Sequence, residues 1–366
     1  MRISQFTSLA AFALTLFALP TAADTIHRTD GKVLEDITIV EEKLVEVVYK
    51  KGSNQRSVAS DEILRVEFAK KPRLVDEADQ ALIDGDVFGA LDLFDLYVDG
   101  QINKPNERRK WAPAYAAQRA IEICQVLDDV AGVVKRSDRL ITNFADSRYV
   151  PSAYLAKAGA QSRQGKGSAA QSTLEALNQL VQSQSLSRRW ALEAQLGLIL
   201  TDESMGGDAK RDKLEEVVSD AGSLFPTVAS RAQVSIGETY LDEIDAASQG
   251  KREGIAEQAQ DIFGRIVKDQ KADSETLAAA YAGLGTALFH IGAIRRDTKV
   301  THESLMNFLR VIVLYKDHSR YVSQSMFFAM LIFKQTEDVD RFREMKWKLQ
   351  QRYPQSTWAE QANDYK

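Results

Sequence analysis

The spacing of hydrophobic residues changes once along this chain, near residue 70. From Thr25 to Phe68, apolar and polar positions alternate in short runs, and after Val75 apolar residues recur three and four positions apart. Alternation places every second side chain on one face of a β-strand, whereas the wider spacing places apolar side chains on one face of an α-helix. The pattern therefore predicts a small β module over residues 24–70 and a helical region over residues 71–366.

The β module is expected to contain about five short strands, separated by turn signals such as Asp30-Gly31 and Lys51-Gly52. The expected strands are Thr25–Arg28, Val33–Val40, Leu44–Tyr49, Arg56–Val58 and Ile63–Phe68. So short a segment is near the lower limit for an independent core, which favours a small β-barrel or a strongly bent β-sheet. The module could cap the open end of the helical region or act as a second binding module beside it. A third possibility is that the module is the binding part and the helices are only a spacer.

The helical region is expected to form antiparallel hairpins. In the first, Gly85-Asp86 interrupts an apolar pattern that runs from Val75 to Tyr97. The six later hairpins pair Lys110–Cys124 with Asp129–Phe144, Pro151–Gln164 with Ser168–Gln182, Leu186–Leu200 with Lys213–Leu224, Thr227–Ile244 with Gly254–Asp269, Ser274–Ile291 with Thr301–Tyr315, and Tyr321–Lys334 with Val339–Tyr353. About seven hairpins of roughly 40 residues each are typical of a mainly α fold of the α-solenoid class.

A short phrase is repeated along the chain. Ser147-Arg148-Tyr149-Val150 recurs as Ser319-Arg320-Tyr321-Val322, each time after an aromatic residue and before a run of small and apolar residues. A looser copy, Tyr353-Pro354-Gln355-Ser356-Thr357-Trp358, closes the chain. A turn that ends one helix and starts the next, reused in this way, indicates stacked helical hairpins.

Two segments resemble the tetratricopeptide repeat (TPR) family. Residues 78–94 follow the order Ala-x-x-Ala-Leu, Gly-Asp, Ala-Leu-x-x-Phe, in which small residues let two helices approach closely. The Tyr353–Trp358 turn resembles the inter-repeat turn of TPR proteins of the Gram-negative cell envelope, where Pro stops one helix and Ser caps the next. The β module, with Asp30-Gly31-Lys32-Val33, Asp61-Glu62-Ile63 and Val66-Glu67-Phe68, resembles small β-barrels that begin some exported bacterial repeat proteins. The resemblance implies a TPR-like solenoid that binds protein or peptide partners in the cell envelope.

The first 23 residues have the pattern of a secretory signal peptide. Arg2 precedes an apolar run from Leu9 to Leu19, and the small residues Thr21-Ala22-Ala23 predict cleavage after Ala23. The run is shorter than the roughly 20 apolar residues that a membrane-spanning helix needs. No Cys for lipid attachment lies near the cleavage site, and no later apolar run looks long enough to span a bilayer. We therefore expect a periplasmic or secreted protein without an integral membrane segment.

Composition narrows the class of function further. The chain is 44% hydrophobic and 27% charged, as in ordinary globular proteins. The formal net charge of −5 argues against nucleic acid, because binding phosphate needs a basic face. Cys124 is the single cysteine, so no internal disulfide forms, and its apolar neighbours favour helix packing.

The residues with catalytic potential are poorly placed for chemistry. Asp317-His318-Ser319 has the residue types of a hydrolase triad, but adjacent positions cannot point at one another as a triad requires. Gly165-Lys166-Gly167-Ser168 lacks the glycine spacing of a phosphate loop and follows a helix, so a hairpin turn is the simpler interpretation. The acidic pairs Asp128-Asp129 and Glu215-Glu216 lack calcium-loop spacing. We expect no catalytic residues, no metal and no cofactor.

The predicted function is that of an exported scaffold that binds protein or peptide partners on the concave face of the solenoid. The residues expected on that face, from the first helices of the hairpins, are Arg119, Arg189, Gln233, Tyr240 and Tyr281. The alternative is an enzyme, or a subunit of one, that acts on cell-wall or exported polysaccharide. Two acids converging in a deep pocket would favour the enzyme, and a shallow groove without perturbed acids would favour the scaffold.

Overall fold

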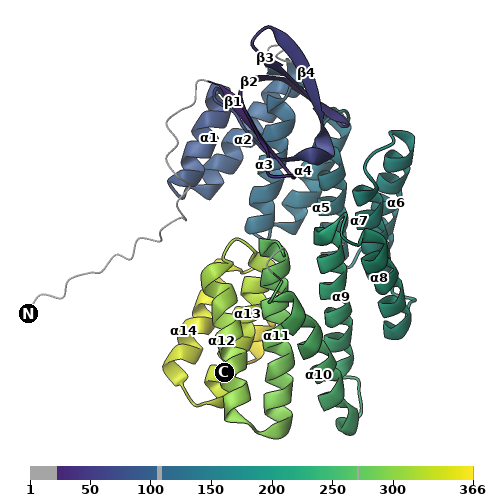
Figure 1. The fold of residues 1–366 in the computed structure, drawn as a ribbon. Coiled ribbons are helices and arrows are strands. Elements are labelled where there is room, and N and C mark those ends of the chain that lie inside the picture. The colour runs from purple at the N-terminus through teal and green to yellow at the C-terminus, as the bar shows by residue number, and fades with distance from the viewer. Residues whose placement is uncertain (1–22, 105–108, 270–271, 366) are drawn as a thin grey trace, which may run out of the picture. The chain divides into compact units, whose positions relative to one another are not determined.

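The computed structural model describes residues 23–104, 109–269 and 272–365. These residues contain five strands followed by 15 α-helices, so the protein is mainly helical with an N-terminal sheet (Figure 1). The described residues divide into two compact units, one within residues 23–120 and 139–150 and the other within residues 121–138 and 151–365. Except for Ala23, the predicted signal peptide falls outside the described residues.

The sheet is open. Its antiparallel strands are β1 (Asp24–Arg28), β2 (Val33–Glu42), β3 (Glu46–Lys51), β4 (Asn54–Ala59) and β5 (Ile63–Glu67), in the order β4-β3-β2-β1-β5. Since β5 returns to pair with β1, β4 and β5 lie at opposite edges and no pairing closes the sheet. The closed-barrel alternative is therefore wrong. The edge strand β4 tolerates water because its first four residues are polar and exposed.

The sheet has a small apolar core that includes Ile26, Ile37 and Val47, all at most 1% exposed. The buried carboxylate of Asp24 holds the start of β1 in place. It accepts a hydrogen bond from the Ile39 amide at 2.7 Å and one from the Ala69 amide at 2.9 Å. One side chain thus ties three parts of the β module together.

Helices α1 (Arg73–Ile83) and α2 (Val87–Asn103) form the first hairpin, and α3 (Ala112–Val126) and α4 (Val130–Asn143) each contribute to both units. The predicted break at Gly85-Asp86 is confirmed. Gly85 has φ +84°, a left-handed conformation that glycine adopts at low cost, and the Asp86 carboxylate accepts a hydrogen bond from the Gly89 amide at 2.9 Å to cap α2.

The second unit continues with helices that match the predicted hairpins closely. They are α5 (Val150–Arg163), α6 (Gly167–Ser183), α7 (Arg188–Thr201), α8 (Gly207–Ala221), α9 (Pro226–Ile244), α10 (Gln249–Ile266), α11 (Ser274–Arg295), α12 (Thr298–Leu314), α13 (Ser319–Gln335), α14 (Val339–Arg352) and the short α15 (Thr357–Gln361). Helices α8 and α10 begin earlier than predicted because glycines near their starts are accepted within the helix. A glycine within a helix costs about 1 kcal/mol relative to alanine, which is too little to stop either helix.

Each helix from α6 to α14 packs against the next one along the chain, and the odd-numbered helices α7, α9, α11 and α13 also pack against one another in turn. The odd-numbered helices therefore form one row, and Figure 1 shows α11 to α14 side by side. Glycines permit this close approach. The ring of Phe263 on α10 fills the space that a Cβ atom would occupy at Gly237 of α9 and at Gly283 of α11.

Helix α11 corrects one expectation from the sequence. Among the described residues it is the one helix whose length and apolar composition would allow it to cross a membrane. In the fold it is a core helix, because 61% of its most apolar window is buried inside the protein and its small residues pack against Phe263 and Phe308. Its apolar character follows from being covered by protein on most sides.

Candidate functional site

The first copy of the repeated phrase forms a buried network. It lies in the turn between α4 and α5, where the Arg148 guanidinium stacks over the Tyr149 ring at 4.6 Å. Arg148 Nε donates to Glu42 Oε1 at 2.6 Å and the Tyr149 hydroxyl donates to Glu42 Oε2 at 3.0 Å. Lys43, next to Glu42, forms an antiparallel bridge with Ser147. The turn therefore receives the end of strand β2.

The Glu42 side chain is fully removed from solvent and that of Arg148 is 12% exposed. Burial raises the pKa of Glu42, and the nearby Arg148 charge opposes this rise. Burial also lowers the pKa of Arg148, but Tyr149 and Glu42 more than compensate, so the pKa of Arg148 lies above its ordinary value. With its charges paired and covered, this network holds the sheet on the helices of the first unit.

The second copy of the phrase has the same Arg–Tyr stack in a more open setting. At the start of α13, the Arg320 guanidinium lies over the Tyr321 ring at 5.2 Å. Arg320 Nη2 is 3.4 Å from Glu238 Oε1 on α9. The Arg320 side chain is 60% exposed and that of Glu238 33% exposed. The Ser319 hydroxyl donates to the Gln125 carbonyl at 2.9 Å, which fixes the first turn of α13.

Other charged residues of the odd-numbered helices surround this second copy. On α9, Arg231, Glu238 and Asp242 are spaced seven and four residues apart, which places them on one face of the helix. Arg231 Nη1 lies 3.1 Å from a carboxylate oxygen of the buried Glu193 on α7. We call the following residues the polar cluster: Glu193, Arg231, Glu238, Asp242, Arg320 and Tyr321.

The pKa values of the cluster show that its carboxylates are poorly solvated. Burial raises the pKa of Glu238, although the Arg320 charge lowers it in part. Burial also raises the pKa of Asp242, and the charges of Lys210 and Arg320 oppose this rise. Within the part of the chain that the structure describes, Asp242 forms no ion pair. Burial raises the pKa of Tyr321 to about 12. Accessible charged groups with incomplete solvation are suited to form charge-assisted hydrogen bonds with a ligand.

Two of the predicted binding residues are arginines in different units. Arg119 belongs to the first unit, where its Nε lies 3.9 Å from Asp79 Oδ1. Arg189 belongs to the second unit, and its guanidinium lies over the Trp190 ring at 5.0 Å. Their place on a binding face stays a prediction.

The other three predicted residues lie on α9 and α11. Gln233 is exposed, and Tyr240 and Tyr281 are partly buried. The Arg211 guanidinium of α8 covers Tyr240 at 4.2 Å, and Arg310 of α12 covers Tyr281 at 4.8 Å. At about 100° per residue, Gln233 lies nearly half a turn from Arg231 on α9. The structure thus places Gln233 and Tyr240 away from the face of α9 that carries the polar cluster.

The sequence reasoning missed the polar cluster although signals for it were present. The repeated phrase pointed to Arg320 and Tyr321, and Arg231, Glu238 and Asp242 share one helix face. What the sequence lacked was any indication of which acid would meet each arginine of the phrase.

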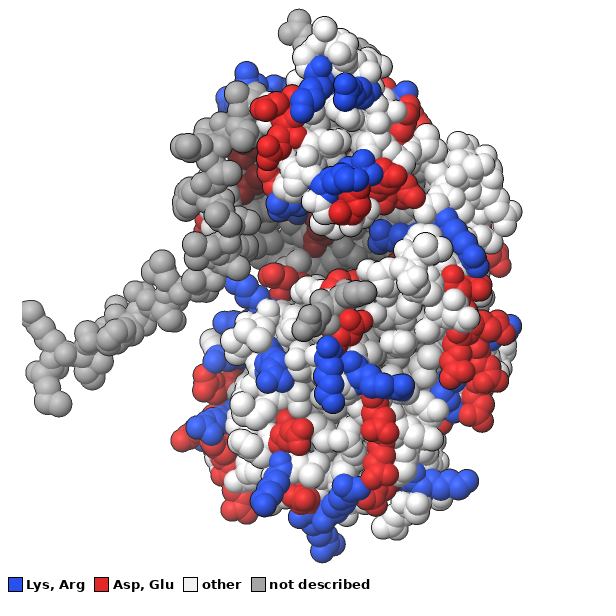
Figure 2. Space-filling view, viewed as in Figure 1, with Lys and Arg blue, Asp and Glu red and all other residues white. Residues whose placement is uncertain are grey.

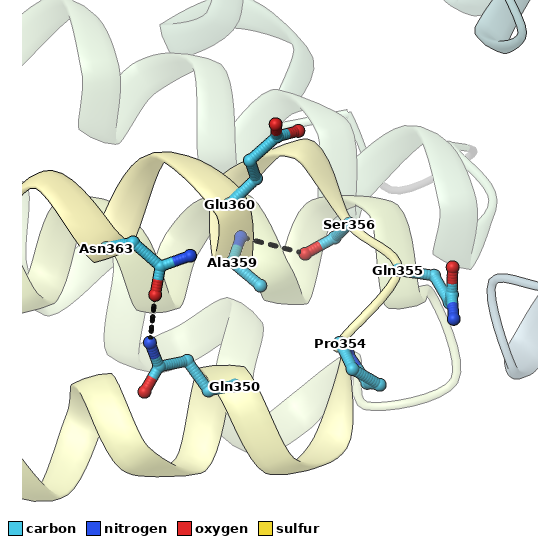
Figure 3. Close-up of a pocket in the computed structure, with 7 residues that line it drawn as sticks. All are labelled: Gln350, Pro354, Gln355, Ser356, Ala359, Glu360 and Asn363. Carbon is cyan, nitrogen blue, oxygen red and sulfur yellow. Dashed lines mark hydrogen bonds between the residues drawn. The ribbon is translucent and has the colours of Figure 1, made fainter.

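The third copy of the phrase forms the predicted helix-stopping turn. Helix α14 ends at Arg352, and the Ser356 hydroxyl caps α15 by accepting a hydrogen bond from the Ala359 amide at 3.1 Å. A polar depression lies against this turn, and the Gln350 amide donates to Asn363 Oδ1 at 2.7 Å across it (Figure 3). Its lining holds one charged residue, Glu360, so it offers little chemistry.

The histidine of the triad-like sequence Asp317-His318-Ser319 contacts a serine of another helix and not the adjacent Ser319. His318 Nε2 lies 2.9 Å from the Ser274 hydroxyl, whereas the adjacent Ser319 donates to the Gln125 carbonyl. Within the described parts of the chain, no group of three or more His, Cys, Asp or Glu residues is arranged to hold a metal ion. The Gly165-Lys166 segment links α5 to α6, and Gly165 has φ +70°, as expected of a hairpin turn.

Comparison with known proteins assigns no family. No protein-family model matches the chain, and no curated protein matches it. Charges of both signs are interspersed over the face shown in Figure 2. Function is therefore argued from the helical packing and the polar cluster.

Proposed function

We propose that this chain is an exported scaffold or adaptor protein that binds protein or peptide partners of the cell envelope through a TPR-like α-solenoid. The observation that carries this proposal is the packing of the helices. Each helix from α6 to α14 packs on its neighbour, and the odd-numbered helices also contact one another in a row. In solenoid proteins, such a row forms an extended surface on which partners bind.

The polar cluster supports a binding role for this row. It brings two arginines, three carboxylates and a tyrosine together on α7, α9 and α13, with side chains of Arg231 and Arg320 that are 38% and 60% exposed. A partner would be held by a few such anchors rather than by total contact area. The predicted signal peptide would deliver the chain to the periplasm or the exterior.

The β module fits a docking role within this proposal. Glu42 at the end of β2 is paired with Arg148 and Tyr149 of the α4–α5 turn, all within the first unit. A buried charge pair is costly to break, so it fixes the sheet on the first helices. This contact supports a sheet that covers the start of the helical array.

One observation favours the second candidate, an enzyme or enzyme subunit that acts on cell-wall or exported polysaccharide. Glu238 and Asp242 lie four residues apart on one face of α9, and burial raises the pKa of both. Paired carboxylates with a raised pKa are the groups that glycoside hydrolysis uses as acid, base or nucleophile. The scaffold remains our proposal because it accounts for the whole helical array.

A crosslinking pull-down of the mature chain from envelope extract, read by mass spectrometry, tests the proposal. We expect one strong protein partner, lost in Arg320→Glu and kept in the matched control Arg341→Glu, whose side chain is 68% exposed on α14. Enrichment of glycan instead of protein would overturn the scaffold proposal. Glycan cleavage that Asp242→Asn abolishes would then establish the enzyme.

Export has its own test. If the signal peptide is removed after Ala23, the intact mass of the protein recovered from the periplasm or medium corresponds to a chain that begins at Asp24. A full-length mass in the cytoplasmic fraction would contradict export. This result does not depend on which partner is bound.

A further inference from the structure

The two full copies of the repeated phrase differ in the hydrogen bonds that their arginine and tyrosine form with a carboxylate. In the first copy, the Glu42 carboxylate accepts hydrogen bonds from both Arg148 and Tyr149, at 2.6 and 3.0 Å. In the second copy, Arg320 reaches Glu238 at 3.4 Å through Nη2 alone. The same Arg–Tyr stack therefore has a carboxylate bound firmly in one place and loosely in the other.

The second copy also has spare hydrogen-bonding capacity that solvent reaches. No hydrogen bond to the Tyr321 hydroxyl occurs within the described residues, and this oxygen is not among the polar atoms buried without a partner. Tyr321 as a whole is 8% exposed, so its ring is largely covered. The Arg320 side chain is 60% exposed, compared with 12% for Arg148.

We propose that Arg320 and Tyr321 bind a carboxylate side chain of the partner, in the manner in which Arg148 and Tyr149 bind Glu42. This inference rests on the proposed scaffold function and states the chemistry of the partner, a segment that presents a glutamate or aspartate. The first copy supplies the template within the same chain. A guanidinium and a phenol donate to one carboxylate, and such charge-assisted bonds are about twice as strong as neutral ones.

The approach of the ligand is limited to one side. Ser319 is 4% exposed and its hydroxyl donates to the Gln125 carbonyl, so the chain itself covers this residue of the second copy. The incoming carboxylate must reach the exposed side of the Arg320 guanidinium. Recognition here uses side chains and needs no strand pairing.

The neighbouring acids oppose the binding of a carboxylate, so they decide whether a substitution strengthens or weakens it. Glu238 already touches Arg320, and Asp242, Glu275 and Asp273 also act on Arg320 or on the adjacent Arg231 through their charge. A partner carboxylate therefore competes with Glu238 for Arg320. Removing the Glu238 charge should strengthen binding of a carboxylate and weaken binding of a cation.

The probe is a synthetic peptide with the sequence of residues 37–45, labelled and titrated with the full mature chain by fluorescence anisotropy. We expect binding that Arg320→Gln weakens at least about tenfold and Tyr321→Phe weakens less, consistent with the strength of charge-assisted hydrogen bonds. Glu238→Gln should tighten binding. A second peptide, with Gln in place of Glu at position 42, should bind the wild-type protein weakly. Its affinity should equal that of the unchanged peptide for Arg320→Gln.

Arg341→Gln is the matched control, because Arg341 is 68% exposed on α14 and pairs with Asp338. It should leave the affinity unchanged, and circular dichroism should show the same helix content in all variants. Absence of binding, binding that is indifferent to Arg320→Gln, or weaker binding to Glu238→Gln would each overturn the inference. If the pull-down still recovers a protein partner in that case, the scaffold function stands and only the carboxylate inference is wrong.

Discussion

Adding one methyl group at Gly283 should destabilise the second unit, although alanine is the better helix former. A Cβ atom at this position would lie 2.3, 2.5 and 2.6 Å from three ring carbons of Phe263. Carbon atoms in packed interiors are separated by about 3.5 to 4.0 Å, so the ring would have to move by more than about 1 Å. It cannot move toward α9, since a Cβ atom at Gly237 would also lie only 2.6 Å from it.

The magnitude follows from two opposing effects. Overpacking a rigid core site costs about 1 to 3 kcal/mol, and the ring held between two helices argues for a cost of about 3 kcal/mol. Replacing Gly by Ala within a helix gains about 1 kcal/mol. Gly283→Ala should therefore lower the free energy of unfolding by about 2 kcal/mol.

Urea denaturation followed by circular dichroism measures this change, with midpoint and slope compared so that altered cooperativity is not taken for altered stability. Gly254→Ala is the matched control, because nothing lies within 4 Å of a Cβ atom at that exposed position of α10. It should stabilise by up to about 1 kcal/mol.

A double-mutant cycle with Phe263→Leu isolates the contact. Without the ring, Gly283→Ala should be neutral or stabilising, which corresponds to a coupling of about 2 to 3 kcal/mol. A Gly283→Ala protein as stable as the wild type, or a coupling near zero, would refute the view that Phe263 is wedged between α9 and α11.

Two further predictions concern the Arg–Glu contacts. Arg148→Ala should lower the free energy of unfolding by about 3 to 5 kcal/mol in urea denaturation, because the buried Glu42 would lose its charge partner. Arg73→Ala should change the free energy of unfolding by less than about 1 kcal/mol, because the Arg73 side chain is 86% exposed in its helix ion pair. Equal effects of the two substitutions would contradict this. Burial raises the folded-state pKa of Glu238 above 4.5, so its stabilising contribution is complete below that pH and is lost as pH rises through the folded value. The stability of Glu238→Gln relative to the wild type should therefore be lower in acid than at neutral pH. A difference in urea midpoint between the two proteins that does not vary with pH would contradict the raised pKa.

The repeated phrase shows how far a local pattern reaches. The sequence marked both copies as turns between helices, and both copies place the arginine over the following tyrosine. Stacking between neighbours is a short-range effect, so identical residues repeat it. The glutamates that meet the two arginines are 106 and 82 residues away in the chain, and nothing near either copy specifies them.

The placement of the predicted binding residues has a related cause. The periodicity of the sequence is enough to predict that α9 is a helix. Predicting which face of α9 is accessible requires knowing which helices pack against it. A shift of two residues turns a side chain by about 200°, so Gln233 and Arg231 lie on nearly opposite sides of one helix. The neighbours of α9 on both sides decide which of these faces remains accessible.

The sequence by itself determined the change from strands to helices near residue 70, the succession of helices that follows, and the turns at Gly85 and Tyr353–Trp358. These features depend on side-chain periodicity, glycine conformation and capping, which act within a few residues. Only the tertiary structure decided that the sheet is open, that α11 is a core helix, and that Arg320 stays exposed while Arg148 is buried. Those outcomes depend on which distant segments exclude water from one another, and periodicity along the chain does not encode that choice.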